Sequence, residues 1–171
     1  MMPIMNVFNE WHSANTSKKI RAVIETNARS GKYKTTFSSY GYDKGSDEKC
    51  TPVIDPEAAA VVRRIFDMRV TGMGYKSIAE VLNREHILIP TDYKYKKLGK
   101  EIGRKSVHLW TTHTIRCILQ NPIYIGTLVQ LRNTTVSYKN HRHIDRDEED
   151  WAVVENNHEP IISMDVWNKC R

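Results

Sequence analysis

The chain has few cysteines and no long apolar segment. Its three cysteines, Cys50, Cys117 and Cys170, lie far apart and form no C-x-x-C pair. Their odd number and wide spacing argue against a disulfide framework and against a zinc site made within the chain, and they fit a reducing cytosol. No segment approaches the roughly 18 apolar residues of a membrane span, and polar residues interrupt the N-terminal apolar positions, unlike in a signal peptide. We therefore expect a cytoplasmic protein without membrane contact.

The charge is positive and unevenly distributed. The 171 residues include 26 Lys and Arg against 20 Asp and Glu, which gives a net charge of +6. Residues 18–34 and 94–105 are strongly basic, whereas residues 145–150 are acidic. A basic chain favours a polyanionic partner, of which nucleic acid is the commonest, and phosphate binding depends on local charge density. The pattern thus favours nucleic-acid binding, with a merely soluble basic protein as the alternative.

The N-terminal segment predicts one long helix. Residues Pro3 to Ser30 contain no internal Gly or Pro, and Gly31 follows them, as at a helix end. The apolar positions form two groups on roughly opposite faces, and these groups are Ile4, Val7, Phe8 and Trp11, then Ile20, Val23 and Ile24. A helix that changes its buried face joins two bodies, so we expect a linker helix; a loosely amphipathic arm is the alternative.

The remaining sequence predicts three helices, a hairpin and a final helix. Asp55 and Pro56 suit the N-cap and the first position of a helix, and Asn121-Pro122 ends a later one. The predicted helices run from Pro56 to Gly72, from Tyr75 to Glu85 and from Thr111 to Gln120, with mostly loop at residues 31–52 and 89–105. Residues 123–131 and 151–155 are predicted strands, with residues 132–150 as their hairpin tip, and a last helix begins after Ser163.

This order of elements predicts an α+β, mainly helical fold, in which a long N-terminal helix precedes an elaborated winged-helix-like domain with a β-hairpin. In a winged helix the third helix lies in the major groove and the hairpin is the wing. Here about 25 residues separate the second and third helices, whereas a simple helix-turn-helix has only about 3–4.

The third helix is the main candidate for DNA contact. Arg can hold guanine with two hydrogen bonds, and Thr can touch a thymine methyl group or a phosphate. The candidate contacts near this helix are Thr111, Thr112, His113 and Arg116, preceded by Arg104 and Lys105 for phosphates. The long helix adds basic candidates at Lys18, Lys19, Arg21, Arg29 and Lys32. The lysines at positions 94, 96, 97 and 100 are expected to contact the DNA backbone or to be merely solvated.

We predict no catalytic group, metal site or cofactor in this chain. Ser13, Ser17 and Ser30 of the long helix have no base or oxyanion donor at an evident spacing. His141 and His143 form an H-x-H pair that could hold a metal, although a polar hairpin tip produces such pairs by chance.

Five segments, in order, resemble the large serine recombinases. Residues 15–34 (NTSKKIRAVIETNARSGKYK) resemble the linker helix of that family, and YGYDK at 40–44 resembles its PYGY turn. Residues 53–87, 110–127 and 157–170 resemble the recombinase domain itself, the second through WTTHTIRCILQNPIYIGT and the third through NHEPIISMDVWNKC. The chain departs from the family before the YGY turn, where Thr35, Thr36, Ser38 and Ser39 replace small Gly and Pro residues.

The resemblance implies a bacterial protein that binds one half of a double-stranded DNA attachment site, associates with further recombinase subunits and integrates or excises a mobile element such as a phage or conjugative transposon. It implies a linker helix at residues 1–31, a DNA-binding domain at 32–160 and, at 161–171, the start of a helix leading to a zinc ribbon, with the catalytic serine on a preceding domain outside this chain. It also places Tyr33 and Lys34 close to the minor groove. A stand-alone winged-helix regulator and an adaptor without a nucleic-acid partner are the rival hypotheses.

Overall fold

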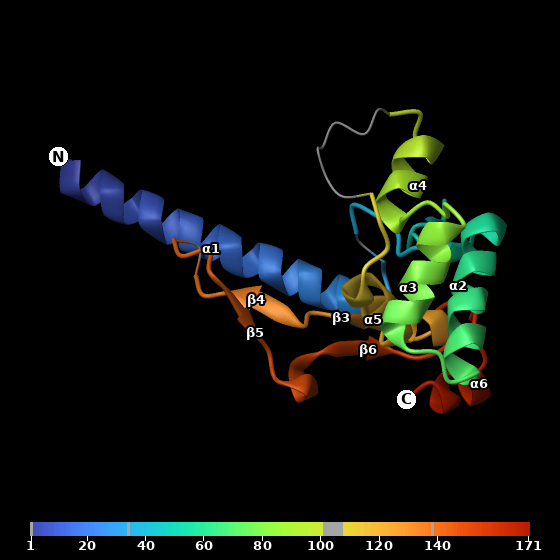
Figure 1. Ribbon diagram of the computed structural model, residues 1–171. Coiled ribbons are helices and arrows are strands. Elements are labelled where there is room, and N and C mark those ends of the chain that lie inside the picture. Colours follow the sequence, from blue (N-terminus) through green and yellow to red (C-terminus); the bar gives the residue numbers. More distant parts are fainter. Residues whose placement is uncertain (1, 34, 101–107, 138) are drawn as a thin grey trace. The chain divides into compact units, whose positions relative to one another are not determined.

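The computed structural model describes residues 2–33, 35–100, 108–137 and 139–171, and for residues 2–9 it describes the helical backbone alone. The fold is α+β, with most of its regular structure in helices and with small two-stranded sheets (Figure 1). The helices are α1 (Met2–Arg29), α2 (Pro56–Val70), α3 (Tyr75–Arg84), α4 (Pro90–Lys97), α5 (Thr112–Leu119) and α6 (Met164–Lys169), with 3-10 turns η1 (Pro122–Ile125) and η2 (Glu148–Asp150). The strands are β1 (Tyr42–Lys44), β2 (Pro52–Ile54), β3 (Leu128–Gln130), β4 (Asn133–Thr135), β5 (His143–Asp145) and β6 (Ala152–Val154).

The chain divides into two compact units that alternate along the sequence. The helix–hairpin unit consists of Met1–Phe37, Lys44–Pro52 and Gly126–His158, and the helical unit consists of Ser38–Asp43, Val53–Ile125 and Glu159–Arg171. No helix in the described part of the chain has the length and apolar character that a membrane span requires.

The helix–hairpin unit is built on α1, which confirms the predicted long helix. Gly31 ends it with a φ of +76°, a backbone conformation that favours glycine, and the Lys32 N–H donates to the Asn27 carbonyl at 3.0 Å. The Asn157 side chain donates to the Gly31 carbonyl at 3.0 Å. Antiparallel strands β3 and β6 pair Leu128 with Val154 and Gln130 with Ala152, so residues far apart in the sequence close this end of α1.

A second hairpin lies beside α1 (Figure 1). Strands β4 and β5 pair Asn133 with Asp145 and Thr135 with His143, and the Arg21 guanidinium donates to the Thr135 hydroxyl at 3.1 Å. Residues 132–150 lie between the paired strands β3 and β6, where an extended hairpin tip was predicted, and they contain a ladder of their own and the turn η2.

The second apolar group of α1 was predicted to be buried, and this prediction was wrong. The exposed fractions of Ile20, Val23 and Ile24 are 54%, 57% and 49%. Near the end of the helix, Ala28 is buried instead. The hairpin reaches α1 through polar contacts, Arg21 with Thr135 and Lys139 with Glu10, and the aliphatic side chains of this helix stay about half-exposed.

The helical unit packs α2, α3, α5 and α6 around one apolar core. The fully buried side chains of this core include Val62, Ile65, Phe66, Ile78, Leu82, Ile115 and Tyr124. The Phe66 ring stacks on Trp167 of α6 at 5.9 Å and meets Tyr124 edge-on at 6.0 Å. The four helix predictions behind this packing, at α2, α3, α5 and α6, are confirmed in type and approximate position.

Gly41 and Tyr42 fix the segment that precedes α2. Gly41 has a φ of +95°, and a Cβ there would lie 2.9 Å from the Ile161 side chain. The Tyr42 hydroxyl donates to the Glu159 carbonyl at 3.0 Å and accepts from the Ile161 N–H at 3.2 Å, and burial raises the pKa of Tyr42 to about 12. The turn at residues 40–42 thus holds residues 159–161 against the core.

Two further local predictions were wrong. Residues 90–97 form helix α4 where a loop was predicted, because Pro90 starts the helix but the polar sequence TDYKYKK shows no apolar periodicity. Residues 123–131 were predicted to be one strand, but η1 and Gly126, with a φ of +80°, occupy the first part, and only Leu128–Gln130 is extended in a ladder.

Candidate nucleic-acid interface

The interface candidate is the exposed side of α5. Thr111 is its N-cap, and the Thr111 hydroxyl accepts from the Thr114 N–H at 3.2 Å. This cap satisfies one of the backbone donors left open at a helix start. Ile115, Ile118 and Leu119 are buried and hold the opposite side of the helix on the core. The apolar spacing thereby fixes which residues of α5 face solvent.

Asn83 at the end of α3 holds the residue that precedes the cap. Its side chain accepts from the Trp110 N–H at 2.7 Å and donates to the Trp110 carbonyl at 3.0 Å. The Trp110 indole N–H donates to the Ile87 carbonyl at 2.9 Å, and the indole is 3% exposed. These three hydrogen bonds set the place of the α5 N-terminus relative to α3, and the sequence alone gave no signal for them.

Replacing Asn83 by alanine is expected to lower the free energy of unfolding by about 1–2 kcal/mol, because it leaves an N–H and a carbonyl of Trp110 without their partner. Urea denaturation would measure this loss. The matched control is Asn133→Ala, at an exposed position of β4, for which we expect a change within about 0.5 kcal/mol. Equal effects of the two substitutions would contradict the role given to Asn83.

The outward side of α5 carries four polar or reactive side chains. Thr112, His113, Arg116 and Cys117 are all exposed. The His113 Nε2 and Cys117 Sγ lie 3.4 Å apart, one helical turn from each other. Arg116 thus has solvent access, in the middle of a short helix whose start is fixed by Asn83 and Thr111.

The basic candidates of α1 belong to the helix–hairpin unit, not to the unit that contains α5. Lys18, Lys19, Arg21 and Arg29 are exposed, Lys32 is half-buried and Tyr33 is buried. Arg29 forms an ion pair with Glu25 at 3.0 Å, and Arg21 bonds Thr135 of the hairpin. Lys18 and Lys19 are therefore stronger candidates for phosphate contact than Arg21 and Arg29, whose side chains already bond to Thr135 and Glu25. Lys34, Arg104 and Lys105 lie outside the described residues.

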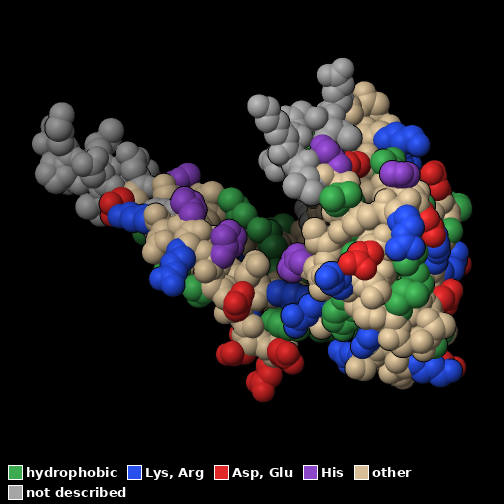
Figure 2. All heavy atoms as spheres, in the orientation of Figure 1, with side chains coloured by type: hydrophobic (Ala, Val, Ile, Leu, Met, Phe, Trp, Pro, Cys, Tyr) green, Lys and Arg blue, Asp and Glu red, His purple; other side chains and the backbone are tan. Residues whose placement is uncertain are grey.

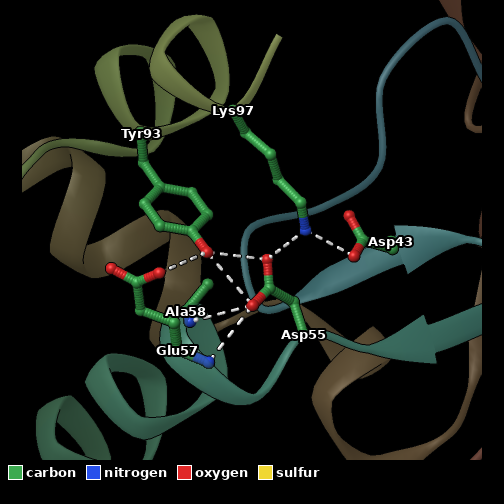
Figure 3. Close-up of polar contacts among 6 residues, drawn as sticks. All are labelled: Asp43, Asp55, Glu57, Ala58, Tyr93 and Lys97. Atoms are coloured by element: carbon green, nitrogen blue, oxygen red, sulfur yellow. Dashed lines mark hydrogen bonds and ion pairs between the residues drawn. The ribbon is translucent and has the colours of Figure 1, made fainter.

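A polar cluster joins α4 to the start of α2 (Figure 3). The Lys97 ammonium lies 2.5 Å from an Asp43 oxygen and 2.8 Å from an Asp55 oxygen. The Tyr93 hydroxyl donates to Asp55 at 2.8 Å. Asp55 also caps α2 by accepting from the N–H groups of Glu57 and Ala58. Of this cluster, the sequence predicted only Asp55 as the N-cap of α2. If residues 90–97 had been predicted as a helix, the i,i+4 spacing of Tyr93 and Lys97 would have indicated that both side chains lie on the same face.

The ionisation of this cluster follows from its contacts. Burial alone would raise the pKa of Asp55, but the hydrogen bonds from Lys97, Tyr93 and Ala58 outweigh it and hold that pKa below its usual value. Burial and the bond to Asp55 raise the pKa of Tyr93. Burial would lower the pKa of Lys97, but its bonds to Asp43 and Asp55 raise it overall. These contacts therefore favour the charged forms of Asp55 and Lys97.

Charged side chains of both signs are mixed on the face of the molecule shown in Figure 2. On the face shown in Figure 2, Lys and Arg side chains of the helical unit lie among Asp and Glu side chains, without forming one uninterrupted patch.

Cys50, Cys117 and Cys170 form no disulfide. Within the described residues no group of three His, Cys, Asp or Glu side chains converges on a possible metal position.

These features define a basic α+β protein with one short, firmly held helix presented to solvent. The model of the Recombinase family matches residues 56–171, which is more than half of the chain and includes α2 to α6. The chain therefore belongs to the Recombinase family. This membership supports a role in site-specific recombination and an interaction with DNA. No solved structure gives a significant match to the chain.

Proposed function

We propose that the chain is the sequence-reading part of a large serine recombinase and that it binds one half of an attachment site in double-stranded DNA. The observation that carries this proposal is α5: a capped helix, fixed by Asn83 and exposing Thr112, His113 and Arg116, in a chain of the Recombinase family. In the proposal α2, α3 and α5 take the roles of the three helices of a winged helix, and α5 enters the major groove, which admits an α-helix.

In this proposal α5 contacts bases and α1 contacts phosphates, as the chemistry of their exposed side chains indicates. Arg116, Thr112 and His113 read base edges, whereas Lys18, Lys19, Arg21 and Arg29 of α1 neutralise phosphates, which gives affinity without sequence preference. In this proposal residues 1–31 link to a catalytic domain, residues 32–160 bind DNA and residues 161–171 lead towards a zinc ribbon. Further recombinase subunits assemble with it on the complete site, for integration or excision of a mobile element.

The test is selection from a pool of random duplexes. The purified chain should enrich a defined sequence after several rounds, and footprinting on that sequence should show protection over one half-site with bases contacted in the major groove. If no sequence is enriched and the affinity depends only on the salt concentration, this result would contradict sequence-specific recognition. The chain would then bind DNA through its phosphates alone.

Supercoiled plasmid carrying the enriched sequence should stay intact and free of covalently attached protein when it is incubated with this chain. The reason is that a serine nucleophile needs an adjacent base. The Ser30 hydroxyl instead donates to the backbone carbonyl of Asn27, which is not a base that could activate it. Gel electrophoresis with and without protease treatment would reveal nicks or adducts, and either would contradict this expectation.

A further inference from the structure

We propose that Tyr93 and Lys97 of α4 are positioning residues, which act on the sequence preference of α5 through the protein and without touching DNA. This inference rests on the proposed function, because it assumes that α5 reads bases. It concerns a helix that has no counterpart in a simple helix-turn-helix and that lies between α3 and α5 in the chain.

The first step is the charge balance at Lys97. Its ammonium lies between Asp43 and Asp55 at 2.5 and 2.8 Å (Figure 3), so both carboxyl groups lie against this cation, and Asp43 also interacts with Lys94. A phosphate approaching this point would meet the carboxylates as well as the ammonium, and releasing Lys97 would leave the buried Asp55 without its ion pair. Lys97 is therefore poorly suited to bind the DNA backbone and well suited to anchor α4.

The second step connects α4 to the residues that enter α5. Asp92 of α4 is buried, and one of its oxygens lies 2.8 Å from Nδ1 of His108, three residues before the Thr111 cap. The ring of Tyr40 meets Tyr93 edge-on at 5.6 Å and Trp110 edge-on at 5.8 Å. Tyr93 thus contacts both Asp55 and the aromatic ring that packs on Trp110.

The third step is the consequence for the recognition of base edges by α5. Asn83 holds Trp110 through α3, while Tyr40 and the pair of Asp92 and His108 brace the same region through α4. The start of α5 is then fixed from two helices. Hydrogen bonds to base edges require close alignment, whereas phosphate contacts tolerate small displacements of the helix. Loosening α4 should consequently reduce discrimination between sequences more than it reduces non-specific affinity.

The experiment compares Lys97→Met and Tyr93→Phe with the wild-type chain on two probes: the duplex enriched from the random pool and a scrambled duplex of the same composition. The matched control is Lys96→Met, the same change of charge at the exposed neighbouring position of α4. Lys97→Arg tests rescue, because it keeps a cation within reach of both carboxylates. Dissociation constants are measured over a salt series, at a temperature where melting curves show every variant to be folded.

We expect Lys97→Met and Tyr93→Phe to lower the ratio of affinities for the enriched and scrambled duplexes by about five- to tenfold, with the slope of log affinity against log salt unchanged. Lys97→Arg should restore most of the ratio, and Lys96→Met should keep it. Tyr93→Phe removes a single hydroxyl and carries the test if Lys97→Met does not fold.

Two results would overturn the proposal. A salt slope reduced by about one unit in Lys97→Met, with the ratio unchanged, would make Lys97 a phosphate contact. A lower melting temperature with both ratio and slope unchanged would make the cluster purely structural. A wild-type chain that binds both duplexes equally is a different outcome: it contradicts the proposed function itself, and this inference falls with it.

Discussion

Arg116→Ala is expected to weaken binding of the enriched duplex by about 1–3 kcal/mol, roughly five- to 150-fold, and to weaken binding of the scrambled duplex much less. The expectation follows from the exposure of Arg116 on the outward side of α5 and from the cost of losing a two-bond contact to guanine. Binding isotherms on the two duplexes over a salt series would measure the difference.

The matched control for Arg116→Ala is Lys19→Ala, which also removes one exposed positive charge. Its effect should be the same on both duplexes, with a salt slope smaller by about one unit, because a phosphate contact releases a counterion at any sequence. If Arg116→Ala behaved like this control, α5 would not be the reader. The basic residues near α4 or the β4–β5 hairpin would then become the better candidates.

Asp55→Ala should lower the free energy of unfolding by about 3 kcal/mol at neutral pH. The substitution removes the cap of α2, worth about 0.5–2 kcal/mol, and leaves Lys97 and Tyr93 without a buried carboxylate partner, where hydrogen bonds to charged groups contribute about 1.5–3 kcal/mol. Asp43→Ala is the matched control: its carboxylate contacts the same lysine but is half-exposed, so we expect a loss below about 1 kcal/mol.

The charge of Asp55 also gives the stability a pH dependence of known sign. Its pKa in the folded chain is lower than usual, and the unfolded value is about 3.9. The stabilisation is therefore complete above the unfolded value and is lost as the pH falls through the folded value. The gap between the wild-type chain and Asp55→Asn should be constant from about pH 5 to pH 8 and should narrow below about pH 4. A gap that widened in acid would contradict the ion pair.

The elements that the sequence predicted well are those whose own residues decide them. Helix α2 begins at Asp55 and Pro56 and α5 is capped by Thr111, as their capping chemistry indicates, and α1 runs without a break because no Gly or Pro follows Pro3 of its first turn. The exposed side of α5 followed from the spacing of Ile115, Ile118 and Leu119.

The parts that the sequence did not reveal depend on partners distant in the chain. Helix α4 has no apolar stripe and is held instead by Asp43 and Asp55, tens of residues earlier. Asn83 gains its role from Trp110, 27 residues later. The β4–β5 ladder pairs short, polar strands, for which alternation of apolar residues gives no signal. Local patterns cannot specify such contacts, because only the assembled fold brings the partners together.

The pairing of α1 with β6 has a consequence for synthesis on the ribosome. The helix ends at Arg29, whereas the strand that packs near this end begins at Ala152, so about 120 residues must be translated between them. At roughly 5–20 residues per second this takes about 6–25 seconds, and during this time α1 lacks the strand that later contacts it. Contacts between α2, α3 and α5 span a shorter stretch and should form first. The nascent chain would then pass through a stage with a formed α2–α3–α5 core and a basic α1 segment that is not yet in contact with β6.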